Sequence, residues 1–384
     1  MQYESPASDR HTPPRRRSLR WVFLSLAVVI LVAGWTAFWF YAAERAKEVI
    51  AGWLEREARV GRIYTCGSQT LAGFPFRIEV RCADAALQMR GMQPPVSVRM
   101  GDVLIAAQIY QPTLLIGEWS APLSISDEGQ PPKMTANWTL LQTSLRGRPR
   151  APERISVVVD NPAWERVTGG TSERMGAAKH LEVHARMASG TMRDRPVIDL
   201  AIRANALQAP DIYPLISQPT NADVDLTLSG MKDLSPKTWP ERFREIQEAG
   251  GKIDVKASRF AQADWVATGS GALGLTANGR LDGEIRVTIA GLEKLLQQIG
   301  VDYMSRPGAG SDKLNSAFNA LDRIAPGLGG LARDRAGPAI AMGAAMLGQA
   351  TELEGRKAVA LPLRFDDGKV YLGPLKIAET LPLF

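Results

Sequence analysis

Histidine and cysteine, two residue types on which many catalytic and metal sites depend, are scarce in this chain. It has three histidines and two cysteines among 384 residues. A Gly-x-Ser-x-Gly elbow and a Walker A loop are both missing from the sequence, which removes the usual signatures of serine hydrolases and P-loop nucleotide-binding proteins. The sequence therefore selects no catalytic residue, and we expect a protein that is not an enzyme.

His180 and His184 are the only histidines outside the N-terminal arm. Polar and apolar residues alternate from Lys179 to Met187, which predicts a strand. Four residues along a strand separate the two imidazoles by about 13 Å, too far to share one metal ion. We expect no metal site here.

The letters Gly-Ser-Gly-Ala-Leu-Gly at 269–274 match a dinucleotide-binding fingerprint. That fingerprint needs a helix N-terminus after the glycines to hold the pyrophosphate. Turn and strand residues follow here, so the sequence predicts no bound cofactor.

The net charge of +6 is spread thinly outside the N-terminus. Five arginines against two acidic residues in the segment 1–20 account for half of it. No Lys/Arg-rich patch with interleaved aromatics follows, so a nucleic-acid partner is not expected.

An uncharged run from Trp21 to Ala43 dominates the N-terminal region. As a helix it would be about 35 Å long, enough to cross a hydrocarbon core of about 30 Å. Aromatic residues crowd both of its ends, as in an interfacial belt. We predict a transmembrane helix over 21–43.

The arginine excess before this run predicts that the arm 1–20 lies in the cytoplasm and that the bulk of the chain is exported to the other side of the membrane. A cleaved signal peptide is the alternative. Its apolar region would span about 7–15 residues and end at a small-residue site. Here the run is longer and ends on Phe38, Trp39, Phe40 and Tyr41, which favours an uncleaved anchor.

Apolar residues recur at helical spacing from 44 to 60, with charges between them. This predicts an amphipathic helix that links the anchor to the exported domain. The helix would either dock that domain at the membrane surface or pack on its own domain.

Cys66 and Cys82 form an even pair close in sequence. In an oxidising compartment such a pair favours a structural disulfide. Between the cysteines, Gly73, Phe74, Pro75 and Phe76 predict a turn, and alternation from Phe76 to Cys82 predicts a strand. The cysteines would then pin the first hairpin, and the two phenylalanines would belong to the core.

The region 61–384 is a succession of short alternating segments separated by Pro, Gly, Asn and Asp. We predict a mainly β fold: a large curved antiparallel sheet with a few short helices, preceded by one N-terminal transmembrane helix. Turns are predicted at Asn278-Gly279, Asp282-Gly283 and Asp367-Gly368. Helical spacing predicts a helix from Trp239 to Ala249 and a helical insertion at about 311–351.

A membrane anchor, a short amphipathic helix, the Gly-Phe-Pro-Phe-Arg turn at 73–77 and the closing segment RFDDGKVYLGPLKIAETLPLF at 364–384 together resemble the DUF2125 family of uncharacterised bacterial envelope proteins. That family is similar in layout to AsmA-like envelope proteins. The resemblance implies a mostly β protein tethered to the bacterial inner membrane, with its N-terminus in the cytoplasm and its bulk in the periplasm. The AsmA-like relatives imply phospholipid handling or outer-membrane homeostasis.

Two functions remain open from the sequence. One is a non-enzymatic envelope protein whose sheet forms an apolar groove for a phospholipid or its acyl chains, because a sheet this long must bury its apolar face against something. The other is a scaffold that binds envelope proteins through open sheet edges, without a ligand cavity.

Overall fold

A 41-residue helix, α1 (Leu19–Arg59), projects from one end of a long β body. The computed structural model describes residues 19–148, 151–235, 237–295, 298, 348–372 and 375–384. The run 21–43 and the segment 44–59 therefore form one continuous helix. Mean hydropathy within α1 reaches 2.2, and this window is not buried in the protein. In length and composition α1 is compatible with a membrane anchor.

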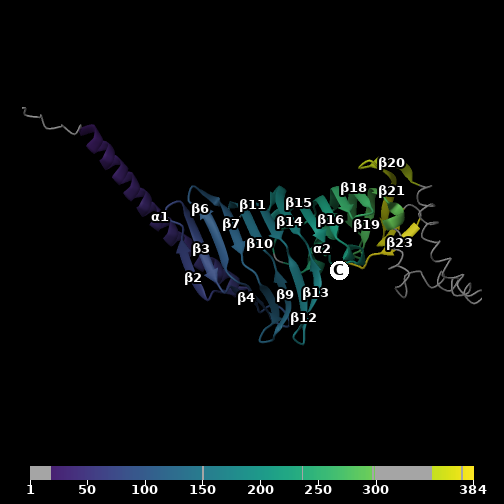
Figure 1. Cartoon of the computed structure of the whole chain (residues 1–384), viewed down its shortest axis with the longest axis horizontal. Coiled ribbons are helices and arrows are strands. Elements are labelled where there is room, and N and C mark those ends of the chain that lie inside the picture. The colour runs from purple at the N-terminus through teal and green to yellow at the C-terminus, as the bar shows by residue number, and fades with distance from the viewer. Residues whose placement is uncertain (1–18, 149–150, 236, 296–297, 299–347, 373–374) are drawn as a thin grey trace, which may run out of the picture.

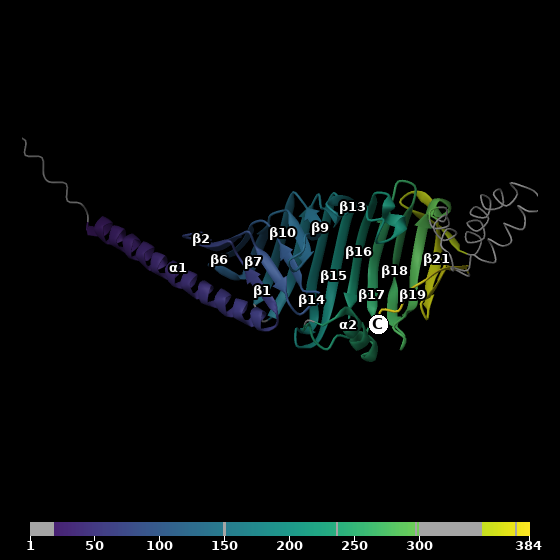
Figure 2. The same cartoon turned by 90° about the horizontal axis from the view of Figure 1, so that it is seen from below.

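Most of the body is one large antiparallel sheet whose strands stand side by side nearly in chain order (Figures 1 and 2). In spatial order its strands are β2 (Ser68–Ala72), β3 (Arg77–Ala83), β6 (Val103–Gln108), β7 (Gln111–Trp119), β10 (Leu140–Arg148), β11 (Ala151–Asp160), β14 (His180–Thr191), β15 (Asp194–Leu207), β16 (Thr220–Leu228), β17 (Ile253–Ala261), β18 (Val266–Leu275), β19 (Leu281–Ala290), β21 (Arg356–Asp366), β22 (Lys369–Leu372) and β23 (Leu375–Glu379). A further strand, β20 (Gln349–Leu353), pairs with β21. The path is open, with β2 and β23 at its two ends.

A smaller antiparallel sheet lies beside the first half of the larger one; Figure 1 shows β9, β12 and β13 below the main row of strands. In spatial order its strands are β1 (Arg62–Thr65), β4 (Ala86–Met89), β5 (Val96–Arg99), β8 (Leu123–Asp127), β9 (Pro132–Asn137), β12 (Ala163–Thr168) and β13 (Thr171–Ala177). From β1 to β13 the chain thus alternates between the two sheets, two strands at a time after β1, and from β14 on it stays in the larger sheet.

The joins between the two sheets are short and lie along one line, which we call the crease. They comprise 66–67, 84–85, 100–102, 120–122, 138–139, 161–162 and 178–179. Backbone hydrogen bonds continue across neighbouring joins, such as Met100 N–H to the Ala85 carbonyl at 2.9 Å and Asn161 N–H to the Lys179 carbonyl at 2.8 Å. Each strand pair is therefore a long hairpin that bends at the crease.

Two of the bends use residues that tolerate left-handed backbone. Asp84 has a φ of 51° and Asn161 a φ of 49°. Asp and Asn adopt this region more readily than other non-glycine residues. Single polar residues thus allow these two bends, at joins that interrupt the strands for only two residues.

A compact hydrophobic core lies at the C-terminal end of the larger sheet. Trp265, Ile289 and Leu361 are buried there together with Leu292 and Leu295 of the helical turn after β19. The indole N–H of Trp265 donates to the side-chain oxygens of Gln262 and Gln298. A 3₁₀ turn, η1 (Pro214–Ser217), supplies Leu215 at the margin.

Helix α2 (Trp239–Glu248) lies where the sequence predicts it, between β16 and β17. The Thr238 hydroxyl accepts from the Glu241 N–H, and the Glu241 carboxylate accepts from the Thr238 N–H, forming a capping box. Two such reciprocal bonds satisfy donors that a helix start leaves unpaired.

The mainly β, antiparallel prediction is confirmed, and so are the turns at Asn278-Gly279 and Asp367-Gly368. The turn predicted at Asp282-Gly283 is wrong, because both residues lie inside β19. A Cβ at Gly283 would approach the Ala272 carbonyl oxygen to 2.3 Å, so glycine at this position allows β19 to lie close to β18. A helical insertion is expected at about 311–351. Its residues up to 347 lie outside the described part of the chain, and residues 349–351 belong to β20.

Candidate functional site

The larger sheet has one apolar face, which runs across its strands from β3 to β21. The pairing register shows it: Val80 lies opposite Ile105 on β6, Val157 opposite Val183 on β14, and so on along the sheet. Directly paired residues share a face, and alternate residues along a strand share it too. Its side chains over the first nine of these strands include Ile78, Val80, Val103, Ile105, Leu115, Leu141, Leu145, Ile155, Val157, Val159, Leu181, Val183, Met187, Ile198, Leu200, Ile202, Val224, Leu226, Leu228, Ile253, Val255 and Phe260.

This apolar face is the strongest candidate for a functional surface. From β3 to β19 it crosses ten strand spacings, or about 50 Å at about 4.8 Å each. That exceeds the ~30 Å hydrocarbon core of a bilayer. Contiguous apolar surface on this scale is typical of an interaction or ligand site.

The middle of the apolar face is partly open to solvent. Ile155 on β11 is 45% exposed and Val183 on β14 is 41% exposed. At the C-terminal end the same face is closed, since Ile289 and Leu361 are 4% and 1% exposed under the helical turn that carries Leu292. Side chains of the same kind thus have different surroundings along one face.

The opposite face of the sheet is charged. Asp199 on β15 accepts from Arg186 at 2.6 Å, from the Thr227 hydroxyl at 2.6 Å and from Lys256 at 3.2 Å. These bonds, first of all that of Arg186, hold the pKa of the Asp199 carboxyl well below its usual range. A carboxylate bonded by groups from three other strands is tied down, so this part of the charged face is a structural network.

His180 and His184 lie on β14, on this charged face, as the strand prediction requires. Glu182 lies between them and contacts His180 Nε2 at 2.6 Å and His184 Nε2 at 2.9 Å, while Asp160 contacts His180 Nδ1 at 2.5 Å. The carboxylates of Glu182 and then Asp160, which accept hydrogen bonds from the imidazole, raise the pKa of His180. Within the described residues, no group of three or more His, Cys, Asp or Glu side chains is arranged to hold a metal ion.

A shallow depression on the charged face neighbours this cluster. Its polar lining comprises Arg154, His184, Arg186, Asp199, Asp225 and Lys256. Several of these groups are already bonded to one another across the strands. The depression offers no nucleophile with an adjacent base, so its chemistry is that of a solvated charge network.

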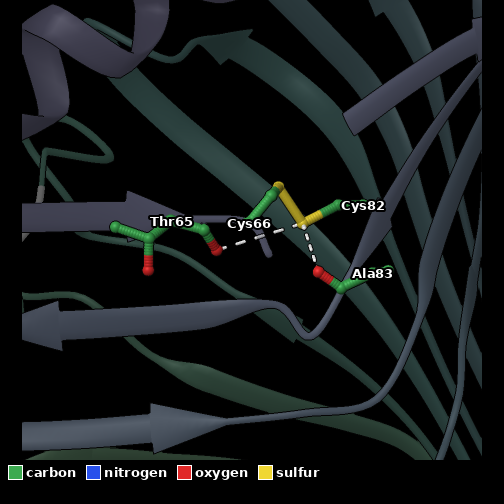
Figure 3. Close-up of a disulfide and its surroundings, with 4 residues drawn as sticks. All are labelled: Thr65, Cys66, Cys82 and Ala83. Atoms are coloured by element: carbon green, nitrogen blue, oxygen red, sulfur yellow. Dashed lines mark hydrogen bonds between the residues drawn. A yellow bond between two sulfur atoms is a disulfide. The ribbon is translucent and has the colours of Figure 1, made fainter. Parts of the chain in front are cut away.

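Cys66 and Cys82 form a disulfide at the first join of the crease, with an S–S distance of 1.99 Å and a Cα–Cα distance of 5.4 Å. Figure 3 shows the sulfur of Cys82 beside the carbonyl oxygens of Thr65 and Ala83, at 3.9 and 4.0 Å. The bridge ties the β1–β2 join to β3, next to the start of the apolar face.

The turn at 73–76 joins β2 to β3 and packs against α1. Gly73 has a φ of 103°, and a Cβ there would meet the Arg77 carbonyl oxygen at 2.6 Å, so the turn needs glycine. Phe74 and Phe76 are 53% and 62% exposed. The expectation that both belong to the core does not hold, because the turn projects beyond the sheet and meets α1 instead.

Helix α1 and this turn share an aromatic cluster. The ring of Phe74 lies 5.5 Å from that of Trp39, edge to face, and Phe76 lies 6.4 Å from Trp35. Further along α1, Trp53 lies 4.8 Å from Tyr64 of β1, and Glu57 bonds Arg62 at 2.5 Å. The later part of the helix therefore packs on its own domain along much of its length.

Comparison with known proteins gives a family but no activity. No curated protein and no solved structure matches the chain. A family model described as "Uncharacterized protein conserved in bacteria (DUF2125)" matches residues 39–380. This match starts within α1 and takes in nearly the whole β body, and on that ground the chain belongs to the DUF2125 family of bacterial proteins.

Proposed function

We propose that this protein is a non-enzymatic, inner-membrane-anchored protein of the bacterial envelope that handles lipid on the apolar face of its larger sheet. In this proposal α1 crosses the membrane, the arm 1–20 lies in the cytoplasm and the β body lies in the periplasm. The observation that carries the proposal is the continuity of the apolar face, from β3 beside α1 to strands far from it.

The chemistry of the two faces selects the part of a lipid that would bind. Acyl chains match a face of Leu, Ile and Val, while a charged head group would lose hydration there without gaining a partner. The ion pairs of the sheet lie on the opposite face, as at Arg186–Asp199. We therefore assign the acyl chains to the apolar face and leave the head group at its rim.

Exposure argues for a ligand in the middle of the face. Half-exposed Ile155 and Val183 gain little from folding alone, whereas contact with an acyl chain would remove their remaining apolar area from water. A face longer than the membrane is thick would also let a bound chain lie wholly outside the bilayer.

Photo-crosslinking in cells tests the proposal. A benzophenone amino acid replaces Ile155 or Val183 on the apolar face; the matched controls place it at Ser156 or His184, the next residues along β11 and β14, on the charged face. We expect phospholipid adducts from the first pair and not from the second. If the probes at 155 and 183 form no phospholipid adduct and remain exposed to buffer, the proposal is wrong.

The same experiment addresses the scaffold alternative. Protein adducts at 155 and 183 in place of lipid would favour an envelope scaffold. A further benzophenone probe on β13, an outer strand of the smaller sheet that pairs with β12 along its length, would also favour a scaffold if it alone formed protein adducts. Its charged residues Glu173 and Arg174 are of the kind that protects a sheet edge from further pairing.

A further inference from the structure

We propose that the β2–β3 turn (Gly73–Phe76), together with the neighbouring β6–β7 turn (Ile109–Tyr110), inserts into the outer leaflet of the membrane that α1 crosses. The occupant of this surface is the bilayer itself. The inference rests on the membrane crossing by α1 in the proposed function, and it does not depend on whether the apolar face carries lipid.

The contact between α1 and the body begins inside the apolar run of the helix. Trp35 is the first half-buried position, and Trp39 and Ala43 follow at 5% exposure each. The uncharged run ends only at Ala43, since Glu44 is the next residue. The body thus overlaps the last nine residues of the run, about 12 Å of helix at about 1.5 Å per residue.

Hydrogen bonds at this overlap suit a place with little water. The indole N–H of Trp35 donates to the Pro75 carbonyl at 2.9 Å, and that of Trp39 donates to the Arg77 carbonyl at 3.0 Å. Pro75 lies in the turn, and Arg77 follows it as the first residue of β3. Backbone groups near a bilayer must find such internal partners.

The outer surface of the two turns is aromatic and uncharged. Phe74, Phe76 and Tyr110 are 53%, 62% and 68% exposed. The Ile109 N–H donates to the Phe76 carbonyl at 3.1 Å, which holds the two turns side by side. Exposed aromatic residues at the end of a membrane helix are typical of the interfacial belt.

Charged residues return directly after the turn. Arg77 is exposed and forms an ion pair with Glu79 on β3. A long cationic side chain at this position can reach the head groups while the phenylalanines lie deeper. Ile78 and Val80, the first side chains of the apolar face, then follow within a few residues of the leaflet.

Depth-dependent quenching in vesicles tests the inference on the full-length protein. Phe76→Cys and Tyr110→Cys each receive an environment-sensitive nitrobenzoxadiazole label, with the native cysteines kept oxidised. Ile212→Cys is the matched control, because Ile212 is also apolar and 72% exposed but follows β15, seven strands away from β2. The vesicles contain phosphatidylethanolamine and phosphatidylglycerol, with iodide on both sides.

We expect labels at 76 and 110 to lose most of their emission to lipids that carry a shallow doxyl group and to resist iodide. The label at 212 should show the reverse. Iodide quenching at 76 and 110 equal to that at 212 would overturn the inference. If alkaline carbonate then leaves the protein in the membrane, anchoring by α1 stands and only the insertion of the turns fails; release of the protein would refute the anchor as well.

Discussion

The C-terminal end and the middle of the apolar face carry similar side chains that differ in burial. At the C-terminal end Ile289 and Leu361 are buried beneath Leu292 and Leu295, whereas in the middle Ile155 and Val183 are more than two-fifths exposed. The first region is an ordinary protein core. The second region has the apolar composition of a core, but its side chains stay partly exposed, as the proposed lipid-binding surface requires.

The largest effect should come from the closed end. Trp265→Ala removes a side chain that is 2% exposed, so we expect unfolding to become easier by about 3–5 kcal/mol. Urea denaturation followed by circular dichroism measures it. Trp239→Ala is the control, because Trp239 is 74% exposed on α2 and should cost less than about 1 kcal/mol. Equal effects would show that the closed end is not a core.

The disulfide should matter next. It lies at the α1 end of the larger sheet and closes a loop with a sequence separation of 16. Replacing both cysteines, Cys66→Ser with Cys82→Ser, should cost about 3 kcal/mol in the chain-entropy model. The same denaturation experiment measures the loss, and reductant should reproduce it in the native protein but not in the variant.

Truncation in the open middle should cost little. Ile155→Ala and Val183→Ala should each lower the free energy of unfolding by less than about 1.5 kcal/mol, well below the ~2–5 kcal/mol of buried sites. The measurement uses delipidated protein. Adding phospholipid should then widen the gap between wild type and variants. If either substitution lowers the free energy of unfolding of the delipidated protein by as much as at a buried site, these side chains are already packed.

The smallest effect concerns the charged face. The bonds that raise the pKa of His180 stabilise the fold fully below the ordinary histidine pKa of about 6.5, and this stabilisation is lost as pH rises through the folded-state pKa. We expect wild type to exceed His180→Gln in urea midpoint at about pH 5.5 and the difference to shrink by about pH 8.5. A difference that grows with pH would contradict the assignment.

Much of this architecture could be predicted from the sequence. The uncharged run 21–43, the alternation from Phe76 to Cys82 and the Asp367-Gly368 turn each depend on neighbouring residues, so local patterns identify them. The alternation at Leu181 and Val183 likewise predicts the apolar face of β14.

The rest depends on contacts between distant residues. Asp282-Gly283 has the sequence of a turn, yet both residues lie in β19 and pair with β18. The glycine is needed because β18 approaches too closely for a Cβ at 283. The crease passes through Asp84 and Asn161, single residues that a strand pattern does not distinguish from an ordinary turn. The local pattern at Phe74 and Phe76 predicts core residues, because it contains no information about their contacts Trp35 and Trp39 on α1, which lie more than thirty residues earlier.

The unbroken course of α1 has a mechanical consequence. Its helical hydrogen bonding continues from Leu19 to Arg59 without a hinge, over about 60 Å at about 1.5 Å per residue, and its second half is fastened to the β body. Helix α1 and the β body must therefore move as one rigid unit. In the proposed membrane orientation, a change in helix tilt caused by a thicker or thinner bilayer would move the distant strands through a wide arc and change their distance from the membrane.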